Sequence, residues 1–553
     1  MARKAPKSGD LSDLKIYTFD FETDPFRFDR VPLPFCVGLS SSDSPADFEH
    51  CWGDHETVVA WIVRKIKEAP PGSIFFAHNG GKFDFHYMLE ECEGDIMVIG
   101  ARIVCAKIGA SEIRDSYSLL PFALAKYQKK EIDYRKMEAD CREEHREEII
   151  EYLQYDCIYL WQLVTGFIRE FGLHITAPGA AIKELTEVHP IDRIGSEIHD
   201  AKYRGFYFGG RVECFKKGIL PGKWKVYDVN SMYPYVMKTF EHPVSAEMVS
   251  YTGKHAWTAL EICDFAKITA TSRGALPWRE KSGSLSFPHA TKTFFATGHE
   301  IRAALELGLL DIHAVDIAYR AVQHEKFDTF VDKFYNARLM AKKVGDEMRV
   351  LFYKLILNSA YGKLAQDPRD FRDWKIEQDV CGGEGWIEEH TFPNGWIIYS
   401  RPTTRPHFTQ RWNIAGAASI TGAARSVLLR GIHAAVNPIY CDTDSLICED
   451  LPLNKSATEL GAWKLEGVGD FAAIAGKKMY ALLDGEKEVK FASKGIRATP
   501  HEIVRLAKGE EITYKIDAPA FRLGRGPYQE VRTKGGKRAG KDARFIERKA
   551  RMT

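Results

Sequence analysis

Two aspartates set two residues apart in an apolar segment constrain this chain more than any other feature. Residues 439–447 read Ile-Tyr-Cys-Asp-Thr-Asp-Ser-Leu-Ile, which favours a β-strand. In a strand, Asp442 and Asp444 lie on one face. Adjacent carboxylates repel unless a cation lies between them, and hard oxygen ligands suit Mg²⁺ or Mn²⁺. The pattern predicts half of a metal site; the alternative is a solvated Asp-Thr-Asp turn, because so short a motif matches by chance.

Partners for these aspartates occur elsewhere in the chain. The segment KVYDVNSMYPY alternates as a strand until its Ser and Pro signal a turn, so Asp228 is expected at a strand end. The helical pattern that includes KLILNSAYG places Lys354, Asn358 and Tyr361 on one helix face. A cation, a polar group and an aromatic ring suit a nucleotide. The alternative is an ordinary amphipathic helix with Lys354 as a solvated charge.

The first third of the chain carries a second acidic set. The segment KIYTFDFET predicts a strand with Asp20 and Glu22 on one face, and AHNGGKFDF supplies Asp84. The segment YLQYD places Tyr152 and Asp156 one helical turn apart. Four carboxylates and a tyrosine suit two-metal hydrolysis of a phosphodiester.

Together these motifs resemble family B DNA polymerases. DVNSMYP (Met232 stands where Leu is usual), KLILNSAYG and YCDTDS are similar to that family's three polymerase motifs, in order. ITGAAR is similar to the helix before the third motif, and the N-terminal acids resemble a proofreading 3′–5′ exonuclease. The probabilities that independent short motifs match by chance multiply, so several motifs together are strong evidence. The resemblance implies a ribonuclease-H-like α/β exonuclease domain followed by a right-hand polymerase domain with palm, fingers and thumb.

The resemblance also assigns roles at two sites, each with two Mg²⁺ (or Mn²⁺) ions. In the polymerase site, Asp228, Asp444 and the Val229 carbonyl would hold metal, with Asp442 beside them. In the exonuclease site, Asp20, Glu22 and Asp156 would hold metal and Asp84 would join catalysis, with Tyr152 orienting water and Lys129 steadying the phosphate. Lys129 stands in a Gln-Lys-Lys-Glu run, so a solvated surface is the alternative.

Substrate contacts follow from the same resemblance. For the nucleotide they are Tyr233 under the sugar, Lys354 at the triphosphate with Lys342 or Arg349 earlier on the same helix, and Asn358, Tyr361 and Gly362 around the base pair. For DNA they are Asn79, Ser116 and Phe122 in the exonuclease, Tyr207, Gly209 and Gly210 of a Tyr-x-Gly-Gly linker motif, and Lys478 and Tyr480 of a Lys-x-Tyr motif. A second Tyr-x-Gly at Tyr203 leaves the linker alignment open.

Within family B, the chain resembles the protein-primed polymerases. The segments FDFETDPF and DRVPLPF further resemble a tectivirus-type enzyme. In 553 residues the acidic motifs begin at Asp20, which leaves no room for a large N-terminal domain. The expected boundaries are an exonuclease at 1–178, with Pro178 and Gly179 breaking the helical pattern, and a polymerase at 179–553. Within the latter we expect a palm at about 185–240 and 410–485, a terminal-protein-docking insertion at 241–320, fingers at 335–365, a strand-displacement insertion at 366–406 and a thumb at 486–553. Asn394-Gly395 predicts a hairpin in the second insertion.

Composition agrees with this interpretation. Lys and Arg (77) nearly balance Asp and Glu (76), but basic residues crowd 532–551, either as a phosphate track or as a disordered charged tail. The 11 cysteines lack a C-x-x-C pair, and no apolar run reaches roughly 18 residues. We therefore expect no membrane partner and a host-cell cytoplasm, bacterial for a phage protein. The expected partners are primer-template DNA, dNTPs, a terminal protein and a single-stranded DNA-binding protein, with the chain a monomer or a heterodimer with terminal protein.

Three alternatives stay open at this point. One is a small DNA-primed family B polymerase of the repair type, and another is an exonuclease without polymerase activity. The third, a non-catalytic DNA-binding scaffold, predicts broken carboxylate sets, and none is broken here.

Overall fold

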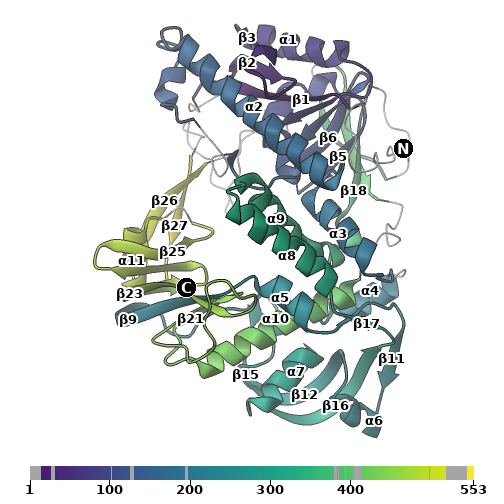
Figure 1. Ribbon diagram of the computed structural model, residues 1–553, viewed down its shortest axis with the longest axis vertical. Helices are drawn as coiled ribbons and strands as arrows, with labels where there is room; N and C mark the ends of the chain where they lie inside the picture. Colours follow the sequence, from purple (N-terminus) through teal and green to yellow (C-terminus); the bar gives the residue numbers. More distant parts are fainter. Residues whose placement is uncertain are drawn as a thin grey trace.

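The computed structural model describes residues 14–25, 32–100, 102–124, 130–193, 197–378, 383, 385–392, 394–403, 413–496, 498–517 and 545–552 (Figure 1). Lys129 and most of the basic tail lie outside these ranges. Among the helices described, none combines the length and apolar character needed to cross a membrane.

A ten-stranded mixed sheet organises the N-terminal part, in the order β19-β20-β18-β5-β6-β7-β4-β1-β2-β3. Its strands are β1 (Ile16–Thr23), β2 (Pro34–Ser40), β3 (Phe48–Trp52), β4 (Ile74–Ala77), β5 (Gly94–Ile99), β6 (Arg102–Ile108), β7 (Ser111–Asp115), β18 (Arg372–Glu377), β19 (Ile387–Thr391) and β20 (Ile397–Pro402). Strand β18 pairs antiparallel with β5, so the second insertion extends the N-terminal sheet. Strands β19 and β20 form the hairpin predicted from Asn394-Gly395.

Helices α1 (His55–Glu68) and α2 (Arg146–Phe171) cover opposite faces of this sheet. Phe19 of β1 packs in one core with the apolar face of α1. Thr18, the next residue toward the N-terminus, donates from Oγ1 to the Cys157 carbonyl of α2 at 2.8 Å. Asp20 and Glu22 share the parity of Thr18, so they face α2.

Strands from the two segments expected to be palm form a seven-stranded antiparallel sheet, in the order β25-β24-β23-β9-β22-β21-β8. Its strands are β8 (Val212–Cys214), β9 (Gly218–Val229), β21 (Tyr440–Asp442), β22 (Ser445–Cys448), β23 (Trp463–Gly476), β24 (Met479–Asp484) and β25 (Lys487–Ser493). Helices α5 (Met232–Thr239) and α10 (Ile414–Ala434) pack beside it (Figure 1). The sheet therefore continues past residue 486, into the segment expected to be thumb.

The segment 439–447 is not one strand, and that expectation was wrong. Strands β21 and β22 pair antiparallel as a tight hairpin, with Asp442 opposite Ser445. Thr443 takes a positive φ of 60°, which turns the chain between the two aspartates. Asp442 and Asp444 therefore do not lie on one face of a strand. The chain turns between them, as in the alternative interpretation.

Helices α8 (Asp328–Lys343) and α9 (Glu347–Leu364) include the segment expected to be fingers. The expectation that Lys342 shares a helix with Lys354 is wrong, because Gly345 (φ 74°) breaks the chain and Asp346 caps α9. Helix α3 (Ala177–Val188) packs on this pair, and Pro178 lies in its first turn. Proline is tolerated there because its missing N–H would have no intrahelical partner, so the expected break is a helix start.

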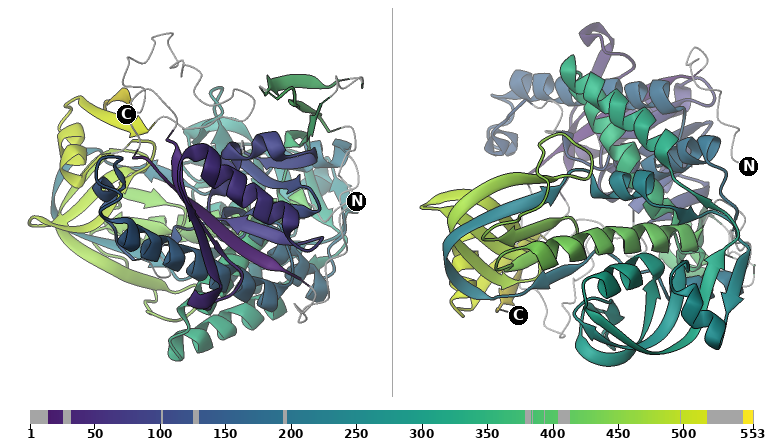
Figure 2. Two further views of the ribbon diagram at one scale, coloured as in Figure 1. Left: turned by 90° about the horizontal axis from the view of Figure 1, so that it is seen from above. Right: turned by 60° about the horizontal axis from the view of Figure 1, so that its bottom comes forward.

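The first insertion is a four-stranded sheet with two covering helices, in the order β11-β16-β12-β15. It comprises β11 (Met248–Tyr251), α6 (Lys254–Ala259), β12 (Phe265–Arg273), β13 (Trp278–Arg279), β14 (Leu285–Ser286), β15 (His289–Thr297), α7 (Gly298–Glu306) and β16 (Leu310–Ala321). Pairing of β10 (His242–Pro243) with β17 (His324–Glu325) closes its base. Helix α10 runs between this insertion and the palm sheet (Figure 2). The remaining elements are α4 (Glu197–Arg204), α11 (Pro500–Ala507), β26 (Ile512–Asp517) and β27 (Phe545–Ala550).

A buried arginine of α10 ties these parts together. Arg425 pairs with Glu300 of α7 at 2.7 Å, and both side chains are only 2% exposed. Its Nη1 also donates to the carbonyls of Phe208 at 2.5 Å and Gly209 at 2.9 Å. The Arg425 guanidinium therefore connects helix α10 to the first insertion and to the linker before β8.

We expect the Arg425→Met substitution to lower the free energy of unfolding by roughly 3–5 kcal/mol, because it leaves Glu300 as an unpaired buried carboxylate. Arg430, on the same helix, pairs with Glu306 of the same α7 at the surface. Arg430→Met should cost less than about 1 kcal/mol. Urea unfolding of both variants tests this, and equal losses would contradict the role given to Arg425.

Candidate active sites

Strand β9 and the β21–β22 turn bring Asp228 and Asp444 together. Asp228 ends its strand as predicted and pairs in register with Ser445. The Val229 N–H donates to the Asp444 carbonyl at 2.8 Å. Burial, and then the Asp444 carboxylate, raise the pKa of Asp228 to about 7. Burial, and then Asp442, raise the pKa of Asp444 to about 6. Such a half-buried, mutually repelling pair suits a divalent cation.

Asp442 makes a different set of contacts. Its carboxylate accepts from Lys478 Nζ at 2.9 Å and from Thr443 Oγ1 at 3.0 Å. The Lys478 N–H in turn donates to the Tyr440 hydroxyl at 3.0 Å, and the Tyr480 ring lies 4.6 Å from that of Tyr440. The Lys-x-Tyr pair predicted to contact DNA thus lies directly beside the site.

The linker between the two halves packs on the same turn. A Cβ at Gly210 would lie 2.6 Å from Thr443 Oγ1, so only glycine fits there without displacing the turn. The Thr443 N–H donates to the Arg211 carbonyl at 2.7 Å. Tyr203, the other start of a Tyr-x-Gly, is buried in α4. The contacts therefore place the Tyr207-x-Gly209-Gly210 segment, and not the one at Tyr203, against the carboxylate turn.

Two tyrosines from different elements stack beside the carboxylates. The rings of Tyr233 on α5 and Tyr361 on α9 lie 4.1 Å apart at 12°. This is a single stacking distance, so no base fits between them. The Tyr361 pKa is raised by burial, then by Tyr233, with Tyr207 and Asp444 also contributing. The three predicted tyrosines thus converge near Asp444.

The other predicted nucleotide ligands divide between the two finger helices. Lys354, Asn358 and Gly362 are exposed on α9, whereas Ile356, Leu357 and Ala360 are buried, as the helical pattern predicts. Arg349 pairs with Asp346 at 3.3 Å and with Glu170 at 3.5 Å. Lys342 is exposed near the end of α8.

The N-terminal acids meet between β1 and α2. Glu22, Asp84 and Asp156 are all buried, although carboxylates rarely are. Asp84 Oδ1 accepts from the Phe21 N–H at 3.4 Å, between Asp20 and Glu22. Burial is the main cause that raises the Asp84 pKa to about 7. Burial also raises the Tyr152 pKa, with Asp156 and Glu22 as the next causes.

Two residues that were predicted to bind single-stranded DNA, Ser116 and Phe122, both contact His78, which was not predicted. His78 contacts Ser116 Oγ through Nδ1 at 3.0 Å and the Phe122 carbonyl through Nε2 at 2.9 Å. Asn79 follows with a positive φ of 66° and is exposed. A Cβ at Gly81 would lie 1.8 Å from the Ile103 carbonyl oxygen, so the Asn-Gly-Gly loop packs closely on β6.

Two further residues of the palm site were not predicted. Glu466 on β23 contributes to the raised pKa of both Asp228 and Asp444, and Lys490 on β25 opposes it. Lys490 pairs with Glu466. Strand β23 pairs with β9 so that Lys464 lies opposite Asp228. A prediction of this strand pairing would have identified β23, and with it Glu466, as a neighbour of the site. Within the described ranges, no three His, Cys, Asp or Glu side chains are arranged as a metal-ligand group.

Comparison with known proteins adds independent findings. The family described as DNA polymerase type B, organellar and viral, matches residues 125–452. A DNA-directed DNA polymerase of Enterobacteria phage PRD1 is 42% identical over 506 residues, covering 89% of this chain and 87% of that protein. The DNA polymerase of Bacillus phage phi29 is 26% identical over 287 residues, or 48% of this chain and 44% of that one.

A solved structure of phi29 DNA polymerase complexed with primer-template DNA and incoming nucleotide shows the same fold. The TM-score is 0.70 at 18% identity, covering 98% of this chain and 100% of that one. The predicted multidomain α/β and α+β architecture is confirmed.

The raised pKa of Asp228 makes a prediction about stability. Its pKa is near 3.8 when unfolded and about 7 when folded. The unfolded state therefore loses its proton first, and stability falls as pH rises from about 4 to about 7. Without divalent metal, Asp228→Asn should raise the melting temperature above that of the wild type, with a gap that widens from pH 5 to pH 7 and then stays constant.

The matched control is Asp450→Asn, because the hydrogen bond from Lys225 lowers the pKa of Asp450 to about 2, so this carboxylate is ionised in the folded and the unfolded state across the range. It should show no such widening. A gap for Asp228→Asn that is constant across this range would contradict the assignment.

Proposed function

The chain belongs to the organellar and viral family of type B DNA polymerases and is a DNA-directed DNA polymerase, and from that premise we propose that it proofreads at a separate exonuclease site and starts synthesis on a protein primer. The observation that carries the synthetic site is the half-buried Asp228–Asp444 pair beside the stacked tyrosines. The observation that carries the second site is the group of buried acids between β1 and α2.

In the synthetic reaction, the primer 3′-oxygen forms a bond to the α-phosphorus of a dNTP as the bond to pyrophosphate breaks. Asp228, Asp444 and the Val229 carbonyl would hold two Mg²⁺ ions, whose donor chemistry they fit. When bound, such ions lower the pKa of the primer hydroxyl and neutralise charge on the phosphate. Lys354 on the exposed face of α9 would bind the triphosphate, with Lys342 or Arg349 assisting.

The two tyrosines would select the substrate. Tyr233 and Tyr361 must separate before a base can enter, because their rings are 4.1 Å apart. The Tyr233 ring would then lie under the sugar and exclude a 2′-hydroxyl. Asn358 and Gly362 would pack around the new base pair. Lys478, neutralised in part by Asp442, would contact the primer end with Tyr480.

In the proofreading reaction, water attacks the last phosphodiester and the 3′-nucleotide leaves as a monophosphate. Asp20, Glu22 and Asp156 would hold the two metal ions, and Asp84 would complete the acidic set. Tyr152, one turn from Asp156 on α2, would orient the water. Asn79, Ser116 and Phe122 would bind the single strand, with His78 holding the last two in place.

The insertions support the proposal of protein priming. The first is closed at its base by the β10–β17 pairing and would dock the terminal protein. The second extends the N-terminal sheet and would separate the strands ahead of synthesis. A single-stranded DNA-binding protein would then cover the displaced strand, in the cytoplasm of the host.

One reaction tests protein priming against a DNA-primed repair polymerase. The enzyme is incubated with candidate terminal protein, Mg²⁺ and a labelled dNTP, without DNA primer. A covalent nucleotide–protein adduct is expected. If DNA-primed extension proceeds and no adduct forms with the terminal protein encoded by the same genome, the DNA-primed alternative is favoured.

Separate carboxylate sets predict separable activities. Asp444→Ala should reduce primer extension by at least about 10³-fold and leave single-strand degradation near wild type. Asp20→Ala combined with Asp84→Ala should do the reverse, with more misincorporation. Both variants are assayed on the same labelled primer with and without dNTPs. Loss of both activities in either folded variant would refute the two-site proposal.

The pairing of Glu377 with Ile397 allows a clean test of strand displacement. Replacing residues 378–396 by Asn-Gly should leave the β18–β20 hairpin on β5, because two-residue Asn-Gly turns suit antiparallel strands. Synthesis on a gapped template should continue and should stop at the first downstream duplex. The matched control replaces residues 280–284, between β13 and β14, in the same way and should still displace strands. Unimpaired displacement in the first variant would refute the role of the second insertion.

A further inference from the structure

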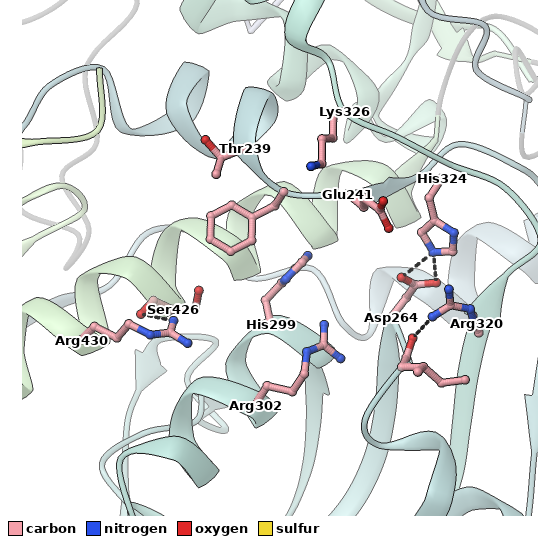
Figure 3. Close-up of a pocket in the computed structure, with 12 residues that line it drawn as sticks. Thr239, Glu241, Asp264, His299, Arg302, Arg320, His324, Lys326, Ser426 and Arg430 are labelled. Atoms are coloured by element: carbon pink, nitrogen blue, oxygen red, sulfur yellow. Dashed lines mark hydrogen bonds and ion pairs between the residues drawn. The ribbon is translucent and has the colours of Figure 1, made fainter. Parts of the chain in front are cut away.

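A cavity of about 350 Å³ lies where the first insertion meets helices α5 and α10 (Figure 3). Thr239, which ends α5, and the two residues after it form one side of the cavity, and Ser426 and Arg430 of α10 form another. Helix α7 contributes Arg302, and strand β16 contributes Arg320. No residue predicted for either carboxylate site lines this cavity, so it requires an explanation of its own.

Cations surround the cavity on several sides. Figure 3 shows Lys326 above, Arg302 below, Arg430 to the left and Arg320 to the right of the central space. Arg430 is paired with Glu306. In the described part of the chain, Arg302, Arg320 and Lys326 have no ion pair with a carboxylate. Within the described residues, these three cations are therefore left without a contact ion pair.

The two insertion arginines are held in place by neutral groups. Arg302 Nη1 donates to the carbonyls of Cys263 at 3.0 Å and Glu261 at 3.3 Å, and Arg320 donates to the Ile262 carbonyl. Carbonyl partners fix a guanidinium without neutralising it. Burial lowers the pKa of Arg302 and nearby Arg320 adds to this, whereas Cys263 and Asp264 oppose it. Arg302 thus carries a partly buried positive charge that an anion in the cavity would stabilise.

The two carboxylates of the lining offset this positive charge only in part. Asp264 contacts His324 Nε2 at 2.9 Å and accepts from the Ala321 N–H at 2.7 Å, so it is already engaged. Glu241 is exposed. The lining therefore holds four cations (Arg302, Arg320, Lys326 and Arg430) against these two acids. A guanidinium offers a planar set of donors that matches phosphate oxygens.

We propose that this cavity is a binding site for phosphate groups. Cations placed on opposite sides suit a tetrahedral anion with several oxygens better than a planar carboxylate. The volume, near the lower end of the range for small-ligand sites of roughly 300–1,000 Å³, admits a diphosphate such as pyrophosphate. A phosphate of a DNA backbone carries the same chemistry. A bound anion would join the insertion to α5, whose first turn holds Tyr233.

Calorimetric titration of the full chain with pyrophosphate tests the site, in EDTA so that metal-dependent binding at the carboxylates is absent. Lys326→Gln and Arg320→Gln should each weaken binding by about tenfold, as expected for loss of a charged partner. Both side chains are near the surface, and melting temperatures confirm folding. The matched control is Lys254→Gln, an exposed lysine of the same insertion outside the cavity, which should bind as the wild type does.

A second titration with single-stranded oligothymidylate distinguishes the source of the phosphate. Weakening of pyrophosphate binding alone identifies a small-anion site, and weakening of oligonucleotide binding alone identifies a backbone contact. Both outcomes support a phosphate site. If neither ligand binds, or if the cavity variants and Lys254→Gln lose affinity equally, the proposal is overturned. The test is independent of the proposed proofreading and protein priming.

Discussion

The buried ion pair between Arg425 and Glu300 is the contact on which the geometry of the palm depends. The guanidinium binds the Phe208 and Gly209 carbonyls, which fixes the linker. The next linker residues support the Asp442–Asp444 turn through Gly210 and the Arg211 carbonyl. Glu300 is itself oriented by the capping box that begins α7 at Thr297. This buried ion pair thus supports the turn that carries Asp442 and Asp444, and loss of either partner would leave the other as a buried charge.

Sequence patterns predicted what is local in this protein. Period-two alternation placed Asp228 at a strand end, and helical spacing placed Lys354 and Asn358 on one exposed face of α9. The Asp442–Asp444 turn was only the alternative interpretation, because its residues favour a strand, whereas the positive φ of Thr443 is supported by the distant linker. Tertiary context overrides propensity in such cases.

Contacts between residues far apart in the chain could not be predicted in this way. Glu300 and Arg425 are 125 residues apart, and no local pattern relates them. The same holds for Lys478 with Asp442, for His78 with Phe122, and for the pairing of β18 with β5. The motifs identified the chemistry and its order along the chain. The neighbours that tune that chemistry, such as Glu466 and Lys490, are visible only in the folded sheet.

The pairing of β5 with β18 also has a consequence for how the chain folds as it is made. Strand β5 is complete at Ile99, but its partner begins at Arg372, so more than half of the chain must leave the ribosome before this edge is covered. Until then β5 presents open main-chain groups and the exposed side chains of Met97 and Ile99, the kind of edge that invites pairing with another chain. Asp95 is the one charged side chain on this strand, and a charge on an edge strand opposes such pairing. During synthesis, the N-terminal sheet would therefore expose an edge that favours aggregation until β18 is made and covers it.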